Sequence, residues 1–129
     1  MAKNKTIDID GLAVEIAATL ADYTEDVQKS IELDVAAVAK ETKDELKNTS
    51  PKLTGNYAKG WAVQKIPTTS GRVSYRVYNK NAPHLTHLLE YGHKKVTGGM
   101  VRAIPHIDPA NRKAQEALLK KIKESIQKA

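Results

Sequence analysis

The chain has 129 residues, no cysteine and a formal net charge of +6. This length predicts a single domain, residues 1–129, with one modest hydrophobic core. The lack of cysteine excludes disulfide bonds, thiol catalysis and cysteine-ligated zinc, and it is typical of proteins that fold in a reducing cytoplasm. No apolar stretch is long enough to span a membrane, and residues 1–6 are not followed by the apolar region of a secretory signal. We therefore expect no membrane contact and a fold that depends on side-chain packing.

Charge is distributed unevenly along the chain. Residues 1–48 hold 11 of the 15 acidic and 6 of the 21 basic side chains, a net charge of −5. The remaining 15 basic and 4 acidic side chains give residues 49–129 a net charge of +11. This asymmetry fits nucleic-acid contact by the basic part, association between identical subunits, or two solvated faces of a monomer.

The first predicted element is helical. Over residues 12–46, apolar side chains recur every three or four positions, which is the period of one helix face. The stretch fits one long helix, or two that break near Asp22, because Asp22 and Glu25 have the spacing of a capping box. We expect this acidic helical region, residues 8–48, to end before Pro51, which disfavours a helical conformation in the preceding residue.

A β-hairpin is predicted next. After a turn at residues 54–56, polar and apolar side chains alternate from Tyr57 to Val63 and again from Val73 to Val77. The turn-rich stretch 67–71 separates the two runs. The first helix is expected to cover the apolar face of this hairpin.

Two helices are predicted in the rest of the chain. Residues 83–91 form about two turns with Leu85, Leu88 and Leu89 on one side, and Gly92 ends the helix. A C-terminal helix runs from Ala110 to about Gln127, with Asp108 and Pro109 at its start and a stripe of Ala114, Leu118, Ile122 and Ile126. Between the helices, the basic, glycine-containing segment 94–102 is predicted to be a mobile surface loop. The fold class is therefore α+β, with residues 51–128 as its basic part.

His84, His87, Glu90 and His93 form a candidate metal site, because each lies three residues from the next. A metal-dependent hydrolase would be the corresponding function. The spacing differs from the His-Glu-x-x-His motif of zinc hydrolases, and residues nine positions apart point to opposite sides of a straight helix. We therefore expect no metal here, and hydrogen bonding or subunit contact for these side chains.

Other motifs for catalysis or cofactor binding do not occur in the sequence. No serine lies in a Gly-x-Ser-x-Gly elbow, and neither the phosphate-binding loop nor the dinucleotide-binding glycine pattern is present. We expect no enzymatic activity and no cofactor.

Nucleic-acid binding by the hairpin is the alternative function. Its basic residues are Lys59, Lys65, Arg72, Arg76 and Lys80, and its aromatic residues are Trp61, Tyr75 and Tyr78. Exposed aromatic and basic side chains on strands can bind single strands by stacking and charge. The alternation places Trp61 and Tyr75 on the packed side, however, where a chain without phenylalanine needs them in the core.

Two blocks of sequence resemble a known family. The first, Ser50-Pro51-Lys52-Leu53-Thr54-Gly55-Asn56-Tyr57, is similar to the family pattern Pro-x-x-Thr-Gly-x-Leu. The second comprises Val77-Tyr78-Asn79, His87-Leu88-Leu89-Glu90-Tyr91-Gly92-His93, Gly98-Gly99, Pro105-His106-Ile107 and Pro109-Ala110. In this order, over about residues 45–126, they resemble the head–tail joining, or tail-component, proteins of long-tailed bacteriophages and prophages.

The resemblance implies a non-enzymatic structural subunit of the phage neck that joins head to tail and assembles with neighbouring subunits, commonly as a ring. Its partners would be copies of itself and other neck or tail proteins, with transient contact to phage DNA in the channel. It would occur in the host cytoplasm during assembly and then at the head–tail junction of the virion. The implied motif and assembly residues are Pro51, Thr54, Gly55, His87, Leu88, Leu89, Glu90, Tyr91, Gly92, His93, Lys94, Lys95, Gly98, Gly99, Arg102, Pro105 and His106.

Overall fold

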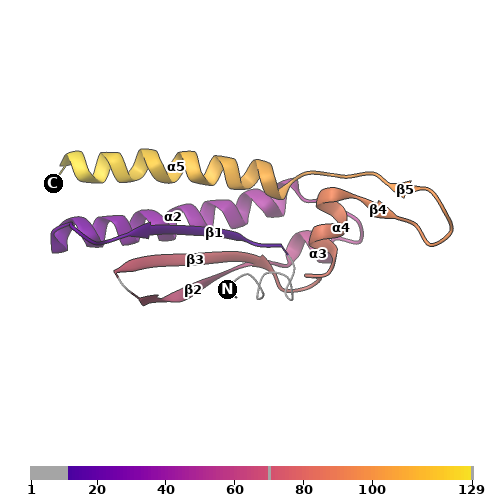
Figure 1. Ribbon diagram of the computed structural model, residues 1–129, viewed down its shortest axis with the longest axis horizontal. Coiled ribbons are helices and arrows are strands. Elements are labelled where there is room, and N and C mark those ends of the chain that lie inside the picture. Colours follow the sequence, from indigo (N-terminus) through magenta and orange to yellow (C-terminus); the bar gives the residue numbers. More distant parts are fainter. Residues whose placement is uncertain (1–11, 70, 129) are drawn as a thin grey trace.

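The structure is a computed structural model that describes residues 12–69 and 71–128. Its elements are β1 (Val14–Thr19), α2 (Glu25–Thr49), α3 (Asn56–Lys59), β2 (Trp61–Thr69), β3 (Arg72–Asn79), α4 (Leu85–Tyr91), β4 (His93–Lys94), β5 (Met100–Val101) and α5 (Ile107–Lys128). In Figure 1, α2 lies along the sheet, α5 runs beside α2 in the opposite direction, and the β4–β5 hairpin projects from one end. The α+β fold class is confirmed. Of the predicted acidic helical region, residues 8–11 lie outside the described residues.

Residues 14–19 form a strand, so the prediction of helix for this stretch is wrong. Strand β1 pairs antiparallel with β3, with Val14 opposite Val77 and Ile16 opposite Tyr75. Val14 and Ile16 are buried while Glu15 between them is exposed. A spacing of four residues places side chains on one face of both a helix and a strand, so the local pattern did not discriminate between them. The hydrogen-bonding partner β3 decides the outcome.

The single long helix begins at Glu25. Thr24 is its N-cap, and the Thr24 hydroxyl accepts a hydrogen bond from the Val27 backbone N–H at 3.4 Å. The predicted break near Asp22 lies at the turn between β1 and α2, where Asp22 adopts a positive φ of 69°. At the other end the helix stops at Thr49, two residues before Pro51, as predicted.

The three-stranded antiparallel sheet has the order β1–β3–β2. Its β2–β3 hairpin was predicted, but Tyr57 belongs to the short helix α3, and the first strand starts only at Trp61. Strand β2 also continues through Pro67, which was expected in the turn. Proline is tolerated there because β2 is an edge strand with a register shift between Ile66 and Thr69.

The hydrophobic core lies between α2 and one face of the sheet, and α5 extends it. Trp61 on β2, Val73 and Val77 on β3, and Ile16 on β1 are all buried. The facing residues of α2 are Val27, Ile31, Val35, Val38, Ala39 and Leu46. The buried Trp61 confirms the core role predicted for this side chain.

Helix α5 begins at Ile107, three residues earlier than predicted, and packs against α2. Ala114 and Leu118 are buried as expected, whereas Ile126, the last residue of the predicted stripe, is exposed. No helix in the described ranges has the length and apolarity needed to cross a membrane.

Polar contacts also join the two long helices. Lys113 on α5 pairs with Glu45 on α2 at 3.0 Å, and Lys121 pairs with Glu41 at 3.8 Å. The Ser125 hydroxyl donates to the Asp34 carboxylate at 2.7 Å. Part of the charge asymmetry between the two halves of the chain is therefore matched within one subunit.

Candidate functional site

The hairpin end of the molecule brings together both motif blocks. We define this end as helices α3 and α4, the arm (residues 93–101, which contain β4 and β5) and the link 102–106 that leads into α5. Figure 1 shows it at the pole of the long axis where α2 finishes and α5 starts. The arm, predicted as a mobile loop, is a small antiparallel hairpin in which His93 pairs with Val101 and Lys94 with Met100.

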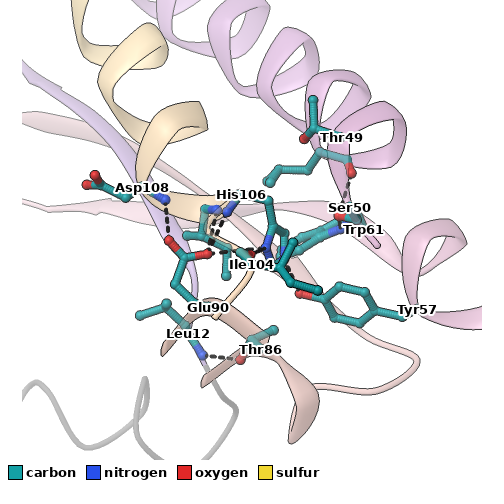
Figure 2. Close-up of polar contacts among 12 residues, drawn as sticks. Leu12, Thr49, Ser50, Tyr57, Trp61, Thr86, Glu90, Ile104, His106 and Asp108 are labelled. Atoms are coloured by element: carbon teal, nitrogen blue, oxygen red, sulfur yellow. Dashed lines mark hydrogen bonds and ion pairs between the residues drawn. The ribbon is translucent and has the colours of Figure 1, made fainter. Parts of the chain in front are cut away.

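Glu90 caps the start of α5 from a different helix. Its Oε1 accepts the backbone N–H groups of His106 and Ile107, both at 2.8 Å, and its Oε2 accepts that of Asp108 at 2.9 Å. Figure 2 shows the carboxylate pointing into this turn. The first N–H groups of a helix have no partner within the helix, and the positive end of the helix dipole favours an anion there. The buried Glu90 thus ties α4 to α5.

His106 links this cap to the first motif block. Its Nδ1 donates to the Ile104 carbonyl at 2.8 Å and lies 3.2 Å from Glu90 Oε1. Because a carbonyl only accepts, Nδ1 carries the proton, so in the neutral imidazole Nε2 is the acceptor for the Tyr57 hydroxyl, 2.7 Å away. Burial, and to a smaller extent the Glu90 carboxylate, raises the pKa of the Tyr57 phenol well above its ordinary value of 10.0. The phenol therefore stays protonated and remains the donor.

Further hydrogen bonds hold Tyr57 and its neighbours in place. The Asn79 amide donates to the Tyr57 carbonyl at 2.7 Å. The Trp61 indole N–H donates to the Ser50 hydroxyl at 2.8 Å, which in turn donates to the Leu46 carbonyl (Figure 2). The Tyr57 ring packs edge-on against both Trp61 and His106. The side chains of Tyr57, Trp61, Asn79 and His106 are therefore all hydrogen-bonded where the hairpin end joins the rest of the molecule.

The arm begins after a close contact at Gly92. Gly92 ends α4, as predicted, and has a positive φ of 76°. A Cβ at this position would lie 2.5 Å from the Val101 carbonyl oxygen. Beside it, the Ile104 backbone N–H donates to the Leu89 carbonyl at 2.7 Å. Glycine is required here by both its backbone conformation and the space available.

Apolar side chains are concentrated on the outside of the hairpin end. Five of the nine exposed large hydrophobic side chains in the described residues lie between residues 88 and 104, and they are Leu88, Tyr91, Val96, Met100 and Ile104. Lys94, Lys95 and Arg102 are exposed among them. An apolar surface rimmed by charge is typical of a protein–protein contact rather than of a catalytic cleft.

A family model described as "Bacteriophage HK97-gp10, putative tail-component" matches residues 15–92, more than half of the chain. The chain belongs to this family. The family consists of structural tail components of bacteriophages, so the chain is a virion protein of that kind. No curated protein and no solved structure matches the chain.

The matched residues of this HK97-gp10 family member run from β1 to Gly92. They contain the Thr-Gly block, in which Gly55 has a positive φ of 92° and starts α3, and Thr54 Oγ1 accepts the Asn56 backbone N–H at 3.4 Å. Pro51 is half-buried at the end of α2. This block places Tyr57 where its hydroxyl reaches His106.

The residues of the second motif block divide into two groups. Leu89, Glu90 and His106 are buried, so they position the hairpin end and do not present a surface. Gly92 and His93 are half-buried at the base of the arm. Exposed residues of the block are His87, Leu88, Tyr91, Lys94, Lys95, Gly98, Gly99, Arg102 and Pro105. Leu88, predicted to lie on one side of the helix with Leu85 and Leu89, is 37% exposed, whereas Leu89 is buried.

The histidines of the candidate metal site are not brought together around Glu90. His84 and His87 are exposed, while the Glu90 carboxylate is turned inward to the α5 backbone. The described residues contain no group of three side chains that could hold a metal ion. The His87 ring instead lies beside the Tyr91 ring, tilted by 30° and with a centroid separation of 6.1 Å.

Some of the hairpin residues considered for nucleic-acid binding are engaged within the chain, whereas Lys59, Lys65 and Lys80 are exposed. Trp61 is buried, and Arg72 pairs with Glu15 at 3.2 Å. The Arg76 guanidinium lies over the Tyr78 ring, 5.3 Å from its centroid. A shallow cavity of about 620 Å³ beside them is lined by Gln64, Ile66, Arg76, Tyr78, Asn79, Lys80 and Pro83. With Trp61 in the core, this sheet face lacks its largest stacking surface.

Sequence reasoning missed the structural roles of Ser50, Tyr57 and Asn79. The two motif blocks contain all three residues, but they carry no information on which side chains meet. Tyr57 and His106 are 49 residues apart, and no local pattern indicates that pairing. The capping of α5 by Glu90, a residue of another helix, could not be predicted either, because the known capping patterns involve residues close in sequence.

Proposed function

We propose that this chain is a subunit of the neck of a tailed phage, where it joins head to tail and assembles with copies of itself as a ring. The observation that carries the proposal is the exposed apolar and cationic surface of the hairpin end in a member of a tail-component family. Monomeric proteins rarely leave such a patch uncovered.

The role is structural rather than catalytic. Two polar side chains of the motif blocks are used inside the subunit, since Glu90 caps α5 and His106 bonds to Tyr57. The partners would be copies of this chain and other neck or tail proteins, with transient contact to DNA in the channel. The subunit would reside in the host cytoplasm during assembly and afterwards at the head–tail junction.

The direct test removes the gene from the phage that encodes the chain. We expect filled heads and separate tails in lysates, seen by electron microscopy, and joined particles when the gene is supplied from a plasmid. Normal numbers of joined, infectious particles without the protein would overturn the proposal. Antibody labelling of intact virions should mark the junction, and labelling confined to another part of the virion would equally refute it.

A second test uses the purified chain. Ring-shaped particles should appear as the protein concentration rises, and they should dissociate as salt increases because charged surfaces take part. Tight DNA binding by the isolated chain, falling steeply with salt, would instead favour the nucleic-acid-binding alternative.

A further inference from the structure

We propose that the arm of one subunit packs against the outer face of the first half of α2 in the next subunit. This inference rests on the self-assembly in the proposed function and names the two surfaces that would meet.

The arm offers apolar and cationic groups. The Val96 side chain is fully exposed and Met100 is 65% exposed. Lys94 and Lys95 lie beside them, and residues 91–107 contain no carboxylate. At the base of the arm the Ile104 backbone N–H donates to the Leu89 carbonyl, and the strands β4 and β5 pair with each other. The binding site of the arm should therefore combine an apolar spot with carboxylates.

The outer face of α2 offers the complementary groups. Leu33 is 71% exposed and lies opposite the buried line of Ile31 and Val35. The carboxylates near it are those of Glu25, Asp26 and Glu32, and Lys29 is exposed among them, so the charge around Leu33 is mainly but not wholly negative. Among the described residues, neither α5 nor the sheet covers Leu33, and Asp26 lies at the edge of this face, where it lines a pocket with Ser125 and Lys128 of α5.

The carboxylates of the first half of α2 differ from those of the second half. Glu41 and Glu45 are paired with Lys121 and Lys113 of α5. Within the described residues, Glu25, Asp26 and Glu32 have no ion pair or side-chain hydrogen bond. The chain thus carries unmatched acids on one surface and unmatched lysines on another, which is the charge complementarity expected of two copies in contact.

The two surfaces lie toward opposite ends of the molecule. Figure 1 shows the arm at one pole and the start of α2 at the other. A subunit therefore cannot bind its own arm, and the contact between copies is head-to-tail. Repeated head-to-tail contacts close into a ring when the rotation between subunits allows it.

Charge reversal tests the pairing in the full chain. Lys94→Glu with Lys95→Glu should raise the dissociation constant for self-association by at least about tenfold, because attraction becomes repulsion. Glu25→Lys with Glu32→Lys should have the same effect. Sedimentation velocity measures assembly, and circular dichroism checks that each variant is folded. The matched control is Lys120→Glu with Lys123→Glu, which changes the same net charge at exposed positions of α5 and should leave assembly near wild type.

The decisive measurement mixes the two reversed variants or combines all four substitutions in one chain. Either sample should assemble again, since each reversed arm then meets a reversed face. Val96→Ser with Met100→Ser should weaken assembly, whereas Leu119→Ser, at an exposed leucine on α5, should not. If the wild type assembles and the arm variants assemble equally well, this inference fails and the proposed ring stands. If the wild type stays monomeric at high concentration and low salt, both fail.

Discussion

The Glu90 carboxylate on α4 accepts the backbone N–H of Ile107, seventeen residues later in the chain, at 2.8 Å. One side chain thereby satisfies the first turn of a 22-residue helix that begins after an entire hairpin has intervened. Because the arm lies between these two residues, the cap also fixes both ends of the arm. Stability of this end should therefore depend on Glu90 more than on any exposed residue of the motif.

Replacing Glu90 should destabilise the protein strongly. Glu90→Ala leaves three backbone N–H groups without their acceptor and should lower the free energy of unfolding by about 3 kcal/mol. Glu90→Gln keeps one oxygen but loses the charge, so its effect should be smaller, about 1–2 kcal/mol. Urea unfolding followed by Trp61 fluorescence measures both. Glu116→Gln, an exposed change on α5, is the control, and equal stability of Glu90→Gln and this control would contradict the capping role.

The raised pKa of the Tyr57 phenol predicts that the protein loses stability at high pH. Because the folded protein holds the pKa of Tyr57 above its unfolded value of 10.0, the folded state keeps a proton that the unfolded state loses. The contribution is fully present below about pH 10 and falls above it by up to about 1.4 kcal/mol per pH unit. Unfolding measured from pH 9 to pH 11.5 should show that Tyr57→Phe removes this fall of the free energy of unfolding with pH. The same substitution should lower the free energy of unfolding by about 1 kcal/mol at neutral pH. Tyr91→Phe, at an exposed tyrosine, should keep the slope; an unchanged slope in Tyr57→Phe would refute the assignment.

Ser50 is expected to stabilise the protein because its hydroxyl accepts the hydrogen bond of the Trp61 indole N–H. Ser50→Ala would leave the buried indole N–H without an acceptor, which should lower the free energy of unfolding by about 1–3 kcal/mol. The adjacent Thr49→Ala is a matched control, since its hydroxyl also bonds to a carbonyl of α2 but is exposed to water. Chemical denaturation of both variants provides the comparison. Indistinguishable midpoints for the two would show that the indole bond contributes little.

Alanine substitutions at Gly92 and Gly98 allow the effect of steric crowding to be distinguished from that of backbone strain. Both have positive φ values, but a Cβ at Gly98 meets nothing within 4 Å, whereas one at Gly92 meets the Val101 carbonyl at 2.5 Å. Gly98→Ala should therefore cost only about 1 kcal/mol, and Gly92→Ala should cost about 1–3 kcal/mol more because the chain must shift. Thermal unfolding of the two variants measures the difference. A smaller loss of stability at Gly92 than at Gly98 would mean that the backbone around Gly92 moves easily to accommodate a Cβ.

Several elements were predictable because their signals are local. Pro51 and Gly92 ended the helices before them, since each acts on the backbone of its own neighbourhood. The alternation of Val73 and Val77 predicted β3, whose buried face follows from the two-residue period of a strand. The exposed cationic arm was also evident, because residues 94–102 combine lysine, arginine and glycine.

Other features depended on partners distant in sequence. The spacing of Val14 and Ile16 fitted a helix as well as a strand, and the antiparallel pairing with β3 decides for the strand. Glu90 has a spacing from the histidines that fits a metal ligand, but its carboxylate accepts hydrogen bonds from the α5 backbone instead. The acidic first half and basic second half suggested contact between subunits, but Lys113 and Lys121 pair with α2 of the same chain.

The sequence by itself determined the α+β class, the order of most elements and membership of a phage tail-component family. These follow from periodicity, helix-ending residues and motif order, all of which are properties of neighbouring residues. Only the tertiary structure decided that β1 is a strand, that Tyr57 bonds to His106, and that Glu90 is a cap. Those outcomes depend on groups far apart in the chain competing for burial and hydrogen bonds, and that competition is settled only when the whole chain packs.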